Sequence, residues 1–192
     1  MNSDGSNLQH LTDMTSNNLF VVSPQWSPDG NRLLFISNKN LDDPSPGALP
    51  NSKSNLWVLD VATGSATPLT RLVDPNGYVD YFDFSDWSPD GSQVVYTSYR
   101  NPTNFADDAA VTSTQPPNIW VVDADGSGHT FPVTKLEDNG VSQLGSFNPQ
   151  WSPDGSKIVY SSFRSLSNFD PKTTDRNFLN IWVTNADGSG GD

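Results

Sequence analysis

The sequence Trp26-Ser27-Pro28-Asp29-Gly30 occurs three times in this chain, and the rest of each repeat follows it in the same order. The second copy begins at Trp87 and the third at Trp151, so the tryptophans lie 61 and 64 residues apart. A segment that returns at a nearly fixed interval is typical of a repeat protein, in which each repeat is one small structural unit. The chain is therefore predicted to contain three copies of one unit.

The residues of this five-residue motif predict a tight hairpin loop. Proline presets φ at the first central position of a turn, aspartate tolerates the second, and glycine takes the left-handed conformation that follows. The tryptophan lies on the strand that enters the turn, where its large ring is expected to pack on a neighbouring sheet. These structural roles are expected at Trp26, Asp29 and Gly30, at Trp87, Asp90 and Gly91, and at Trp151, Asp154 and Gly155.

Each repeat is predicted to hold four strands, a to d. Strand a carries the motif tryptophan, strand b is the alternating apolar run after the glycine, strand c contains a second tryptophan, and strand d is short and ends in threonine. The strand c tryptophans are expected to be buried beside strand b. The expected ranges are 21–27, 32–37, 56–60 and 67–70, then 82–88, 93–98, 119–123 and 131–134, then 147–152, 157–162 and 181–185. The expected pairs are Trp57 with Phe35, Trp120 with Tyr96, and Trp182 with Tyr160.

The chain also opens with an isolated piece of this pattern. Residues 8–12 have the composition of a strand d, but no strand a, b or c precedes them. The third strand c is followed by a turn and by no strand d. The N-terminal strand is therefore expected to complete the last repeat, either in its own chain or in another. The single domain 1–192 is divided into repeats at about 1–60, 61–123 and 124–192.

Four-stranded antiparallel units arranged around an axis form a β-propeller. Trp-Ser-Pro-Asp-Gly, the apolar strand ending in Ser-x-Arg, the Asn-Ile-Trp-Val strand and the closing Leu-Thr resemble the WD-like repeats of the TolB-type propellers. The resemblance implies an all-β fold of three four-stranded blades, which is half or a fragment of a six-bladed propeller. It also implies a periplasmic or extracellular location.

The composition excludes several classes of protein. A net charge of −12 and a pI of about 4.2 leave no basic surface for nucleic acid or for anionic membranes. The chain has no cysteine, which excludes disulfides and thiolate chemistry. No apolar run approaches the 18 residues that a membrane-spanning helix needs. The first residues do not resemble a signal peptide, so either the protein is cytosolic or an export signal is missing from this sequence.

The length of the repeats indicates where binding takes place. Propeller repeats commonly have about 40–45 residues, and the excess here lies mostly between strands b and c, at 38–54, 99–117 and 163–179. In an antiparallel blade these connections leave on the same side as the d–a links, and we call that side the loop-rich face. Loops on a rigid scaffold usually carry the binding residues. Segments 41–51 and 102–115 are therefore expected to bind a partner and not to support the fold.

Charged side chains on the loop-rich face are the candidate binding residues. Asp80 and Asp83 belong to a stretch that runs into a strand a, the strand nearest the axis, and their carboxylates are suited to calcium. The alternative is that these acids only keep the protein soluble. Lys39, Arg100 and Arg164 occupy one position of the repeat, and a structural ion pair is the alternative to ligand binding there. The candidate ligand-binding residues are Asp80, Tyr81, Asp83, Arg100, Asp107, Asp108, Arg164 and Asp170.

No catalytic residues are assigned from the sequence. The two histidines, His10 and His129, are expected at the outer rim, whereas a propeller lyase or metallohydrolase needs imidazoles near the axis. A Gly-x-Ser-x-Gly motif is absent. The stretch that begins at Asp123 resembles the start of a calcium loop, but Thr134 stands where such a loop needs glutamate, so a plain hairpin is expected.

The sequence therefore predicts a non-catalytic module that binds a protein or peptide, or acts as a scaffold, through the loop-rich face. One alternative is the gating propeller of a larger peptidase or hydrolase, and another is a carbohydrate-binding or lyase-like propeller. No cofactor is expected apart from calcium at Asp80 and Asp83, and neither nucleic acid nor membrane insertion is expected. Two further alternatives stay open, a homodimer that closes a six-bladed ring and a piece of a longer propeller.

Overall fold

The protein is described by a computed structural model that places residues 4–12, 19–43, 54–72, 84–102, 116–136, 145–164 and 178–189. In these ranges every regular element is a β-strand, as the sequence predicts. None of the placed residues belongs to a helix that is long and apolar enough to cross a membrane.

The strands form three antiparallel sheets, in which neighbours along the chain are neighbours in the sheet. Blade 1 contains β1 (Val21–Trp26), β2 (Arg32–Ser37), β3 (Asn55–Asp60) and β4 (Ala66–Pro68). Blade 2 contains β5 (Ser85–Trp87), β6 (Gln93–Ser98), β7 (Asn118–Asp123) and β8 (Thr130–Pro132). Blade 3 contains β9 (Ser146–Trp151), β10 (Lys157–Ser162) and β11 (Asn180–Asn185).

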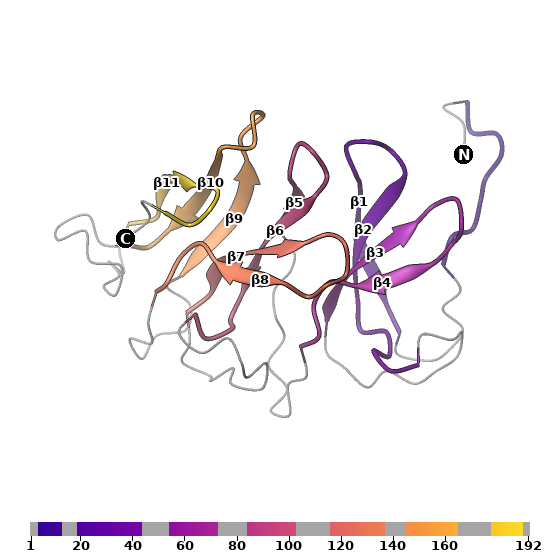
Figure 1. The fold of residues 1–192 in the computed structure, drawn as a ribbon, viewed down its shortest axis with the longest axis horizontal. Coiled ribbons are helices and arrows are strands. Elements are labelled where there is room, and N and C mark those ends of the chain that lie inside the picture. Colours follow the sequence, from indigo (N-terminus) through magenta and orange to yellow (C-terminus); the bar gives the residue numbers. More distant parts are fainter. Residues whose placement is uncertain are drawn as a thin grey trace.

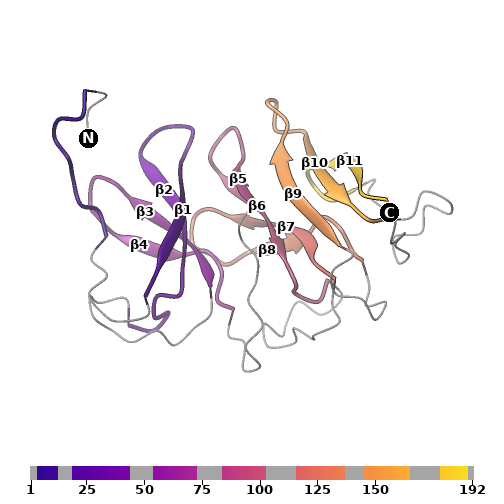
Figure 2. The same cartoon turned by 180° about the vertical axis from the view of Figure 1, so that it is seen from behind.

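The three blades lie side by side in an arc, with the two ends of the chain at opposite ends of the arc (Figures 1 and 2). This arrangement confirms the predicted segment of a propeller. The strand b ranges agree with the prediction, and strands a and c differ from it by a few residues at their ends. Strand d is shorter than expected because the N–H groups of Leu69 and Thr70 both turn to the carbonyl of Leu56.

Each copy of the five-residue motif forms the same hydrogen-bonded turn. In blade 1 the Ser27 hydroxyl donates to Asp29 Oδ1 at 2.6 Å and accepts the N–H of Arg32 at 2.9 Å. The N–H of Gly30 donates to the Ser27 carbonyl at 2.9 Å, and Gly30 has a φ of 73°, which favours glycine. The same contacts recur in the other two copies, so the motif is a structural turn, as predicted.

These turns change the acidity of the three motif aspartates. The Ser27 hydroxyl, followed by the N–H of Asn31, lowers the pKa of Asp29 to about 2. The matching contacts lower the pKa values of Asp90 and Asp154 to about 2 as well, and in both the neighbouring serine hydroxyl has the largest effect. A carboxylate that accepts several hydrogen bonds is stabilised in its charged form.

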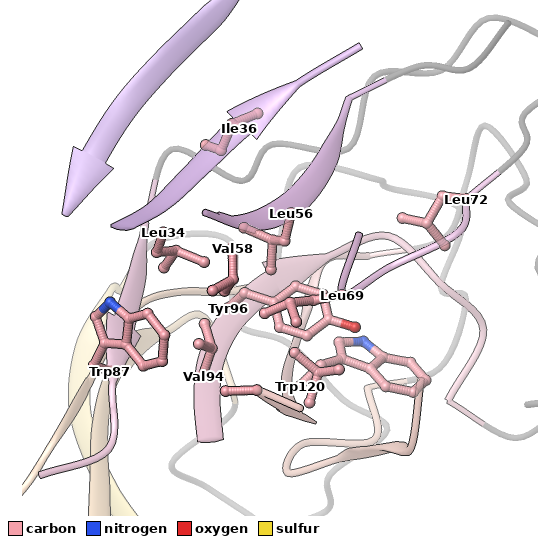
Figure 3. Close-up of a cluster of buried hydrophobic side chains, with 12 residues drawn as sticks. Leu34, Ile36, Leu56, Val58, Leu69, Leu72, Trp87, Val94, Tyr96 and Trp120 are labelled. Carbon is pink, nitrogen blue, oxygen red and sulfur yellow. The ribbon is translucent and has the colours of Figure 1, made fainter. Parts of the chain in front are cut away.

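The blades pack on one another through apolar side chains. Leu34, Leu56 and Val58 of blade 1 meet Trp87 and Trp120 of blade 2 in one buried cluster (Figure 3). A second cluster joins blade 2 to blade 3. Successive side chains of a strand point to opposite faces of its sheet, so a strand of blade 2 contributes to both clusters. Blade 2 therefore presents one apolar face to blade 1 and the other to blade 3.

The strand c tryptophans occupy the predicted core positions in blades 1 and 2. Trp57 pairs across the sheet with Phe35, and Trp120 pairs with Tyr96, and all four side chains are buried. Trp182 pairs with Tyr160 as expected but is only half-buried. The reason is that blade 3 has no fourth strand among the described residues, whereas strand d covers the tryptophan in the other two blades.

Strand d is held in place by a pair of buried side chains, which we call the Asn–Thr latch. In blade 1 the Thr70 hydroxyl donates to Asn55 Oδ1 at 2.8 Å and accepts the N–H of Leu56 at 3.0 Å. Asn55 Oδ1 also accepts the N–H of Leu72 at 2.8 Å, and Asn55 Nδ2 donates to the Leu72 carbonyl at 3.2 Å. The latch satisfies buried polar groups at the point where the sheet ladder ends.

Blade 2 repeats the latch and blade 3 lacks half of it. Asn118, Thr134 and Leu136 make the corresponding four hydrogen bonds in blade 2. The equivalent residue of blade 3 is Asn180, whose buried Nδ2 has no hydrogen-bond partner among the residues placed in the structure. An unpaired buried amide is costly, so blade 3 is an incomplete version of the unit that precedes it.

Residues 8–12 do not form the predicted strand, which corrects that part of the sequence-based prediction. These residues are placed in the structure but belong to none of its sheets. They lie at the N-terminal end of the arc, and β11 lies at the other end (Figures 1 and 2). A strand needs the N–H and C=O groups of a neighbouring strand, and the open edge of β11 is out of reach in the same chain.

The turns predict a pH dependence of stability. The ordinary pKa of an aspartate is 3.8, and in the folded chain it is about 2 at Asp29, Asp90 and Asp154. A lowered folded-state pKa stabilises the fold fully above the unfolded value, and this contribution is lost as the pH falls through the folded value. Stability should therefore decrease between pH 4 and pH 2. Urea unfolding should show a smaller decrease for the Asp29→Asn, Asp90→Asn, Asp154→Asn triple variant, and an equal decrease would contradict this origin.

The core predicts a difference between equivalent tryptophans. Trp120→Ala should lower the free energy of unfolding by about 3–5 kcal/mol, because it leaves a cavity in a packed cluster. Trp182→Ala is the matched control and should lower it less, because the Trp182 side chain is half-buried. Both values can be measured by urea unfolding. A loss below about 1 kcal/mol for Trp120→Ala would place this residue outside the core.

Candidate functional site

The described part of the loop-rich face contains three equivalent cations at the ends of the b strands. Each lies over the strand c tryptophan of its own blade. The distance from the charged group to the ring centre is 5.8 Å for Lys39, 4.9 Å for Arg100 and 5.4 Å for Arg164. The structure describes two of the predicted site residues, Arg100 and Arg164. Each of them lies over the strand c tryptophan of its own blade. Sequence reasoning expected an ion pair or a ligand contact here, and it missed the aromatic partner.

The local fold places these cations identically in all three blades. A serine ends each b strand, and its buried hydroxyl accepts the N–H of the cationic residue two positions later at 3.1 Å. This bond turns the backbone so that the side chain lies back over the blade. Arg100 and Arg164 are buried, and burial lowers the pKa of the half-buried Lys39 amine. A cation over a tryptophan face is attracted by the ring quadrupole and is worth more when it is desolvated.

A small cavity lies beside Arg100 at the outer rim between blades 1 and 2. Its volume is about 120 Å³, and its walls include Thr70 and Arg71 of blade 1 and the turn at Ser127 of blade 2. Arg100 Nη1 donates to the Tyr96 hydroxyl at 3.5 Å, and that hydroxyl lies 3.2 Å from Thr130 Oγ1. The residues that line the cavity include two arginines and the hydroxyl-bearing Thr70, Ser127 and Thr130, which suits a small polar group.

The opposite face, which carries the a–b and c–d turns, uses its polar groups for structure. The Arg32 guanidinium of blade 1 donates to the carbonyls of Gly91 and Ala124 in blade 2, at 2.7 and 3.2 Å. It also lies 5.0 Å from the ring centre of Trp87. One side chain thus joins blade 1 to both turns of blade 2. The stretch from Asp123 forms the β7–β8 hairpin, as predicted, and Asp125 accepts the N–H of Ser127 within it.

A second row of contacts joins the strands nearest the axis. Gln25 Nε2 of β1 donates to the Ser85 carbonyl of β5 at 2.8 Å. The equivalent residue of β5 is Asp86, whose Oδ2 accepts the N–H of Trp151 in β9 at 3.0 Å. Burial raises the pKa of Asp86, with opposing effects from the hydrogen bonds of Trp151 and Trp87. Asp86 therefore links blade 2 to blade 3, and the sequence showed it only as part of an acidic run.

The predicted acidic site cannot be placed on this framework. Asp80, Tyr81, Asp83, Asp107, Asp108 and Asp170 lie outside the described residues. Calcium at Asp80 and Asp83 stays a prediction. Among the residues that the structure does place, no three acids or histidines come together as a metal site.

The bases of two long connections belong to the core. Leu41 packs against the cluster of Phe35, Trp57 and Leu59, and Pro102 is buried. Leu41 and Pro102 therefore belong to the fold, although the sequence placed both in segments that were expected only to bind. Residues 44–53 and 103–115 lie outside the described residues.

Known proteins with similar sequences are much longer than this chain. No protein-family model matches the chain. The uncharacterized peptidase YuxL of Bacillus subtilis is 27% identical over 157 residues, which cover 73% of this chain and 22% of that protein. The Tol-Pal system protein TolB of Anaeromyxobacter dehalogenans is 29% identical over 126 residues, which cover 65% of this chain and 21% of that protein. The chain spans about a fifth of the length of the curated relatives it matches.

Solved structures show the same arrangement of blades. TolB from Acinetobacter baumannii matches 99% of this chain and 34% of its own length, with a TM-score of 0.57 and 16% identity. The chain is TolB-like, and its fold is that of a β-propeller. The β-propeller domain of the Trilobed protease from Pyrococcus furiosus also matches 91% of the chain described here, over 42% of its own length, with a TM-score of 0.52 and 11% identity. At these identities the structural likeness shows the fold alone.

The cations of this TolB-like chain predict a substitution pattern. Arg100→Lys should lower the free energy of unfolding by less than about 1 kcal/mol, because Lys39 already occupies the equivalent place over Trp57. Arg100→Ala removes the charge and the stem that covers Trp120, and should lower it by about 1–2 kcal/mol. Urea unfolding at neutral pH distinguishes the two variants. Equal losses would show that the contact with the ring contributes nothing.

Proposed function

We propose that the chain is a non-catalytic binding or scaffold module that engages a protein or peptide through its loop-rich face. The observation that carries this proposal is the different use of the two faces. On the face with the short turns, the repeated polar residues hydrogen-bond within turns and between blades. On the loop-rich face, long polar connections leave from bases that the blades hold in place. A rigid base with variable loops is the usual arrangement of a recognition surface.

We also propose a role among proteins of the cell envelope, which the family resemblance implies. One relative bears the name Tol-Pal system protein TolB, which describes a component of a protein system. We extend that role to this chain as a proposal, together with the periplasmic or extracellular location that the resemblance implies. Two guanidinium groups beside the outer-rim cavity suit a partner that presents carboxylates there.

A second candidate function is supported by two other relatives. The YuxL sequence is described as a peptidase, and the Trilobed protease contains a propeller domain. In this alternative the chain is the propeller that lies beside the catalytic domain of a larger enzyme and controls access to it. The long connections would then face that domain and not a separate partner.

The two candidates are separated by shortening the connections. Variants in which residues 44–51 or 103–115 are replaced by a short Gly-Ser linker should keep the melting temperature within a few degrees, since loop length affects closure entropy weakly. Immobilised wild-type chain should retain a partner from an envelope extract of the source organism, and the shortened variants should lose it. Ala62→Asp, in an exposed turn of the opposite face, is the matched control and should retain it.

The result that contradicts the main proposal is equally specific. Retention of the same partner by both shortened variants would place binding on another surface. Loss of cooperative unfolding on shortening would assign these segments to the core. For the peptidase alternative, the expected result is hydrolysis of peptides by the full-length gene product, with a size limit on the peptide that disappears when the connections are shortened.

A further inference from the structure

We propose that a cavity between the a–b turns of blades 2 and 3 binds a guanidinium group, supplied by an arginine side chain of a basic peptide. The cavity has a volume of about 200 Å³, and its walls include Pro89 and Gln93 of blade 2 and Trp151 and Gly155 of blade 3. This inference is independent of the proposed function, because the cavity lies on the face with the short turns and not on the loop-rich face.

The junction between blades 1 and 2 shows which chemical group occupies the equivalent position there. The a–b turns of the three blades lie along one edge of the arc (Figures 1 and 2). Between the first two of these turns, the Arg32 guanidinium lies 5.0 Å from the ring centre of Trp87. It donates to the carbonyls of Gly91 and Ala124 at 2.7 and 3.2 Å. The chain itself therefore supplies a guanidinium group at the first junction.

Blades 2 and 3 meet with the same spacing but without that group. A methyl group on the α-carbon of Gly91 would lie 3.5 Å from Pro28 Cδ, and one on Gly155 would lie 3.7 Å from Pro89 Cδ. The position on Gly91 is also 3.3 Å from Arg32 Nη2, whereas no charged atom of the described residues lies within 4 Å of the position on Gly155. The two pairs of turns therefore approach each other equally closely, and the second pair lacks the cation in the part of the chain that the structure places.

The sequence explains the missing cation, because the residue of blade 2 that is equivalent to Arg32 is Gln93. Its side chain stays within its own blade, where Nε2 donates to Asp123 Oδ1 at 2.9 Å. The carbonyls of Gly155 and Ala186 are equivalent to those that Arg32 binds, and they accept no hydrogen bond from the described residues. Glutamine carries no charge, so it also lacks the attraction of a cation to the tryptophan ring. The acceptors and the ring of this junction are therefore open to a guanidinium group from outside.

The cavity is accessible and large enough for this group. Trp87 and Gly91 are buried at the first junction, whereas their equivalents at the second, Trp151 and Gly155, are partly exposed. A cavity of about 150 Å³ can hold benzene, which has more heavy atoms than a guanidinium group. The volume of about 200 Å³ between blades 2 and 3 therefore leaves room for the guanidinium group and the end of its stem.

The charges at the cavity favour a cation over a neutral group. Asp90 and Asp154 both line it, and their lowered pKa values of about 2 keep them ionised at neutral pH. The hydrogen bonds that their turns make to these carboxylates all end on Oδ1, which leaves Oδ2 of each for a donor from outside. In blade 1, by contrast, Asp29 Oδ2 accepts a hydrogen bond from Asn31 Nδ2 at 3.1 Å. Hydrogen bonds between a guanidinium group and a carboxylate are among the strong ones.

The adjoining surface extends the negative charge over blade 2. A broad depression of about 540 Å³ shares Asp90 and Gln93 with the cavity, and its walls also include Asp123 and Asp125. Arg32 lines this depression too, but its guanidinium already binds two carbonyls. A peptide that places an arginine in the cavity would therefore lay its neighbouring residues over an acidic surface, which favours a basic sequence.

The direct test is an NMR titration of the chain with a peptide that contains a single arginine. Acetyl-Gly-Arg-Gly-amide should shift the indole N–H resonance of Trp151, which is identified by its loss in Trp151→Phe. The same peptide with citrulline in place of arginine should bind about tenfold more weakly because it lacks the charge, and the lysine peptide about fivefold more weakly because it lacks the planar fork. Equal binding of the citrulline or lysine peptide would overturn the proposal. The absence of any shift at Trp151 would also overturn it, because only water would then occupy the cavity.

Removal of the two carboxylate charges tests the position of the site. Asp90→Asn and Asp154→Asn should each raise the dissociation constant of the arginine peptide about fivefold, since asparagine keeps an oxygen for the turn but lacks the charge. Asp29→Asn is the matched control, because Asp29 occupies the same position of blade 1 but does not line the cavity, and it should leave the dissociation constant unchanged. An equal effect of all three variants would contradict binding at this cavity.

A substitution within the chain should close the site. Gln93→Arg places a guanidinium group where blade 1 has Arg32, so it should raise the urea midpoint of unfolding and weaken binding of the arginine peptide about tenfold. Ala62→Arg adds the same charge at an exposed turn outside the cavity and should change neither quantity. Unchanged affinity of Gln93→Arg for the peptide would overturn the proposal. The partner expected on the loop-rich face should still be retained by Gln93→Arg, so the two proposals are tested separately.

Discussion

The structure depends on one constraint, which is that the apolar side chains on both faces of a blade have to be buried. Blade 2 meets this requirement fully, since blade 1 covers one face and blade 3 covers the other. The hydrogen bonds of Arg32, Gln25 and Asp86 then fix how neighbouring blades are oriented. Within a blade, the Asn–Thr latch ends the sheet and holds strand d against strand c.

Local sequence patterns explain where the sequence predicted the structure well. The short turns are encoded by five contiguous residues, and strand b follows each turn with an unbroken apolar alternation, so both could be located from local chemistry. The burial of Trp57 and Trp120 followed from their place on strand c. The expected strand at 8–12 failed because a strand is defined by its partner, and no local pattern states where that partner lies.

Other features could not be predicted because they depend on contacts between distant residues. Ser23 and Asn148 take positive φ values of 54° and 53° before a proline, where β1 and β9 each contain a bulge. The sequence signal of each bulge was a proline inside the strand, but β5, the equivalent strand of blade 2, contains no proline. The sequence signal of the latch was an asparagine where strand c begins and a threonine where the expected strand d ends, but only the structure shows that the two side chains meet. The site is less predictable than the fold, because its acids lie on connections that vary in every repeat.

Hydrogen exchange at single amides tests the central claim most directly. The N–H of Ile119 donates to Thr134 Oγ1 in the latch of blade 2, whereas the equivalent N–H of Ile181 has no strand d beside it among the described residues. Exchange should be slow at Ile119 at all protein concentrations. At Ile181 it should be faster, because the described part of blade 3 holds no strand d to cover this edge. Equal protection of the two amides would contradict the account.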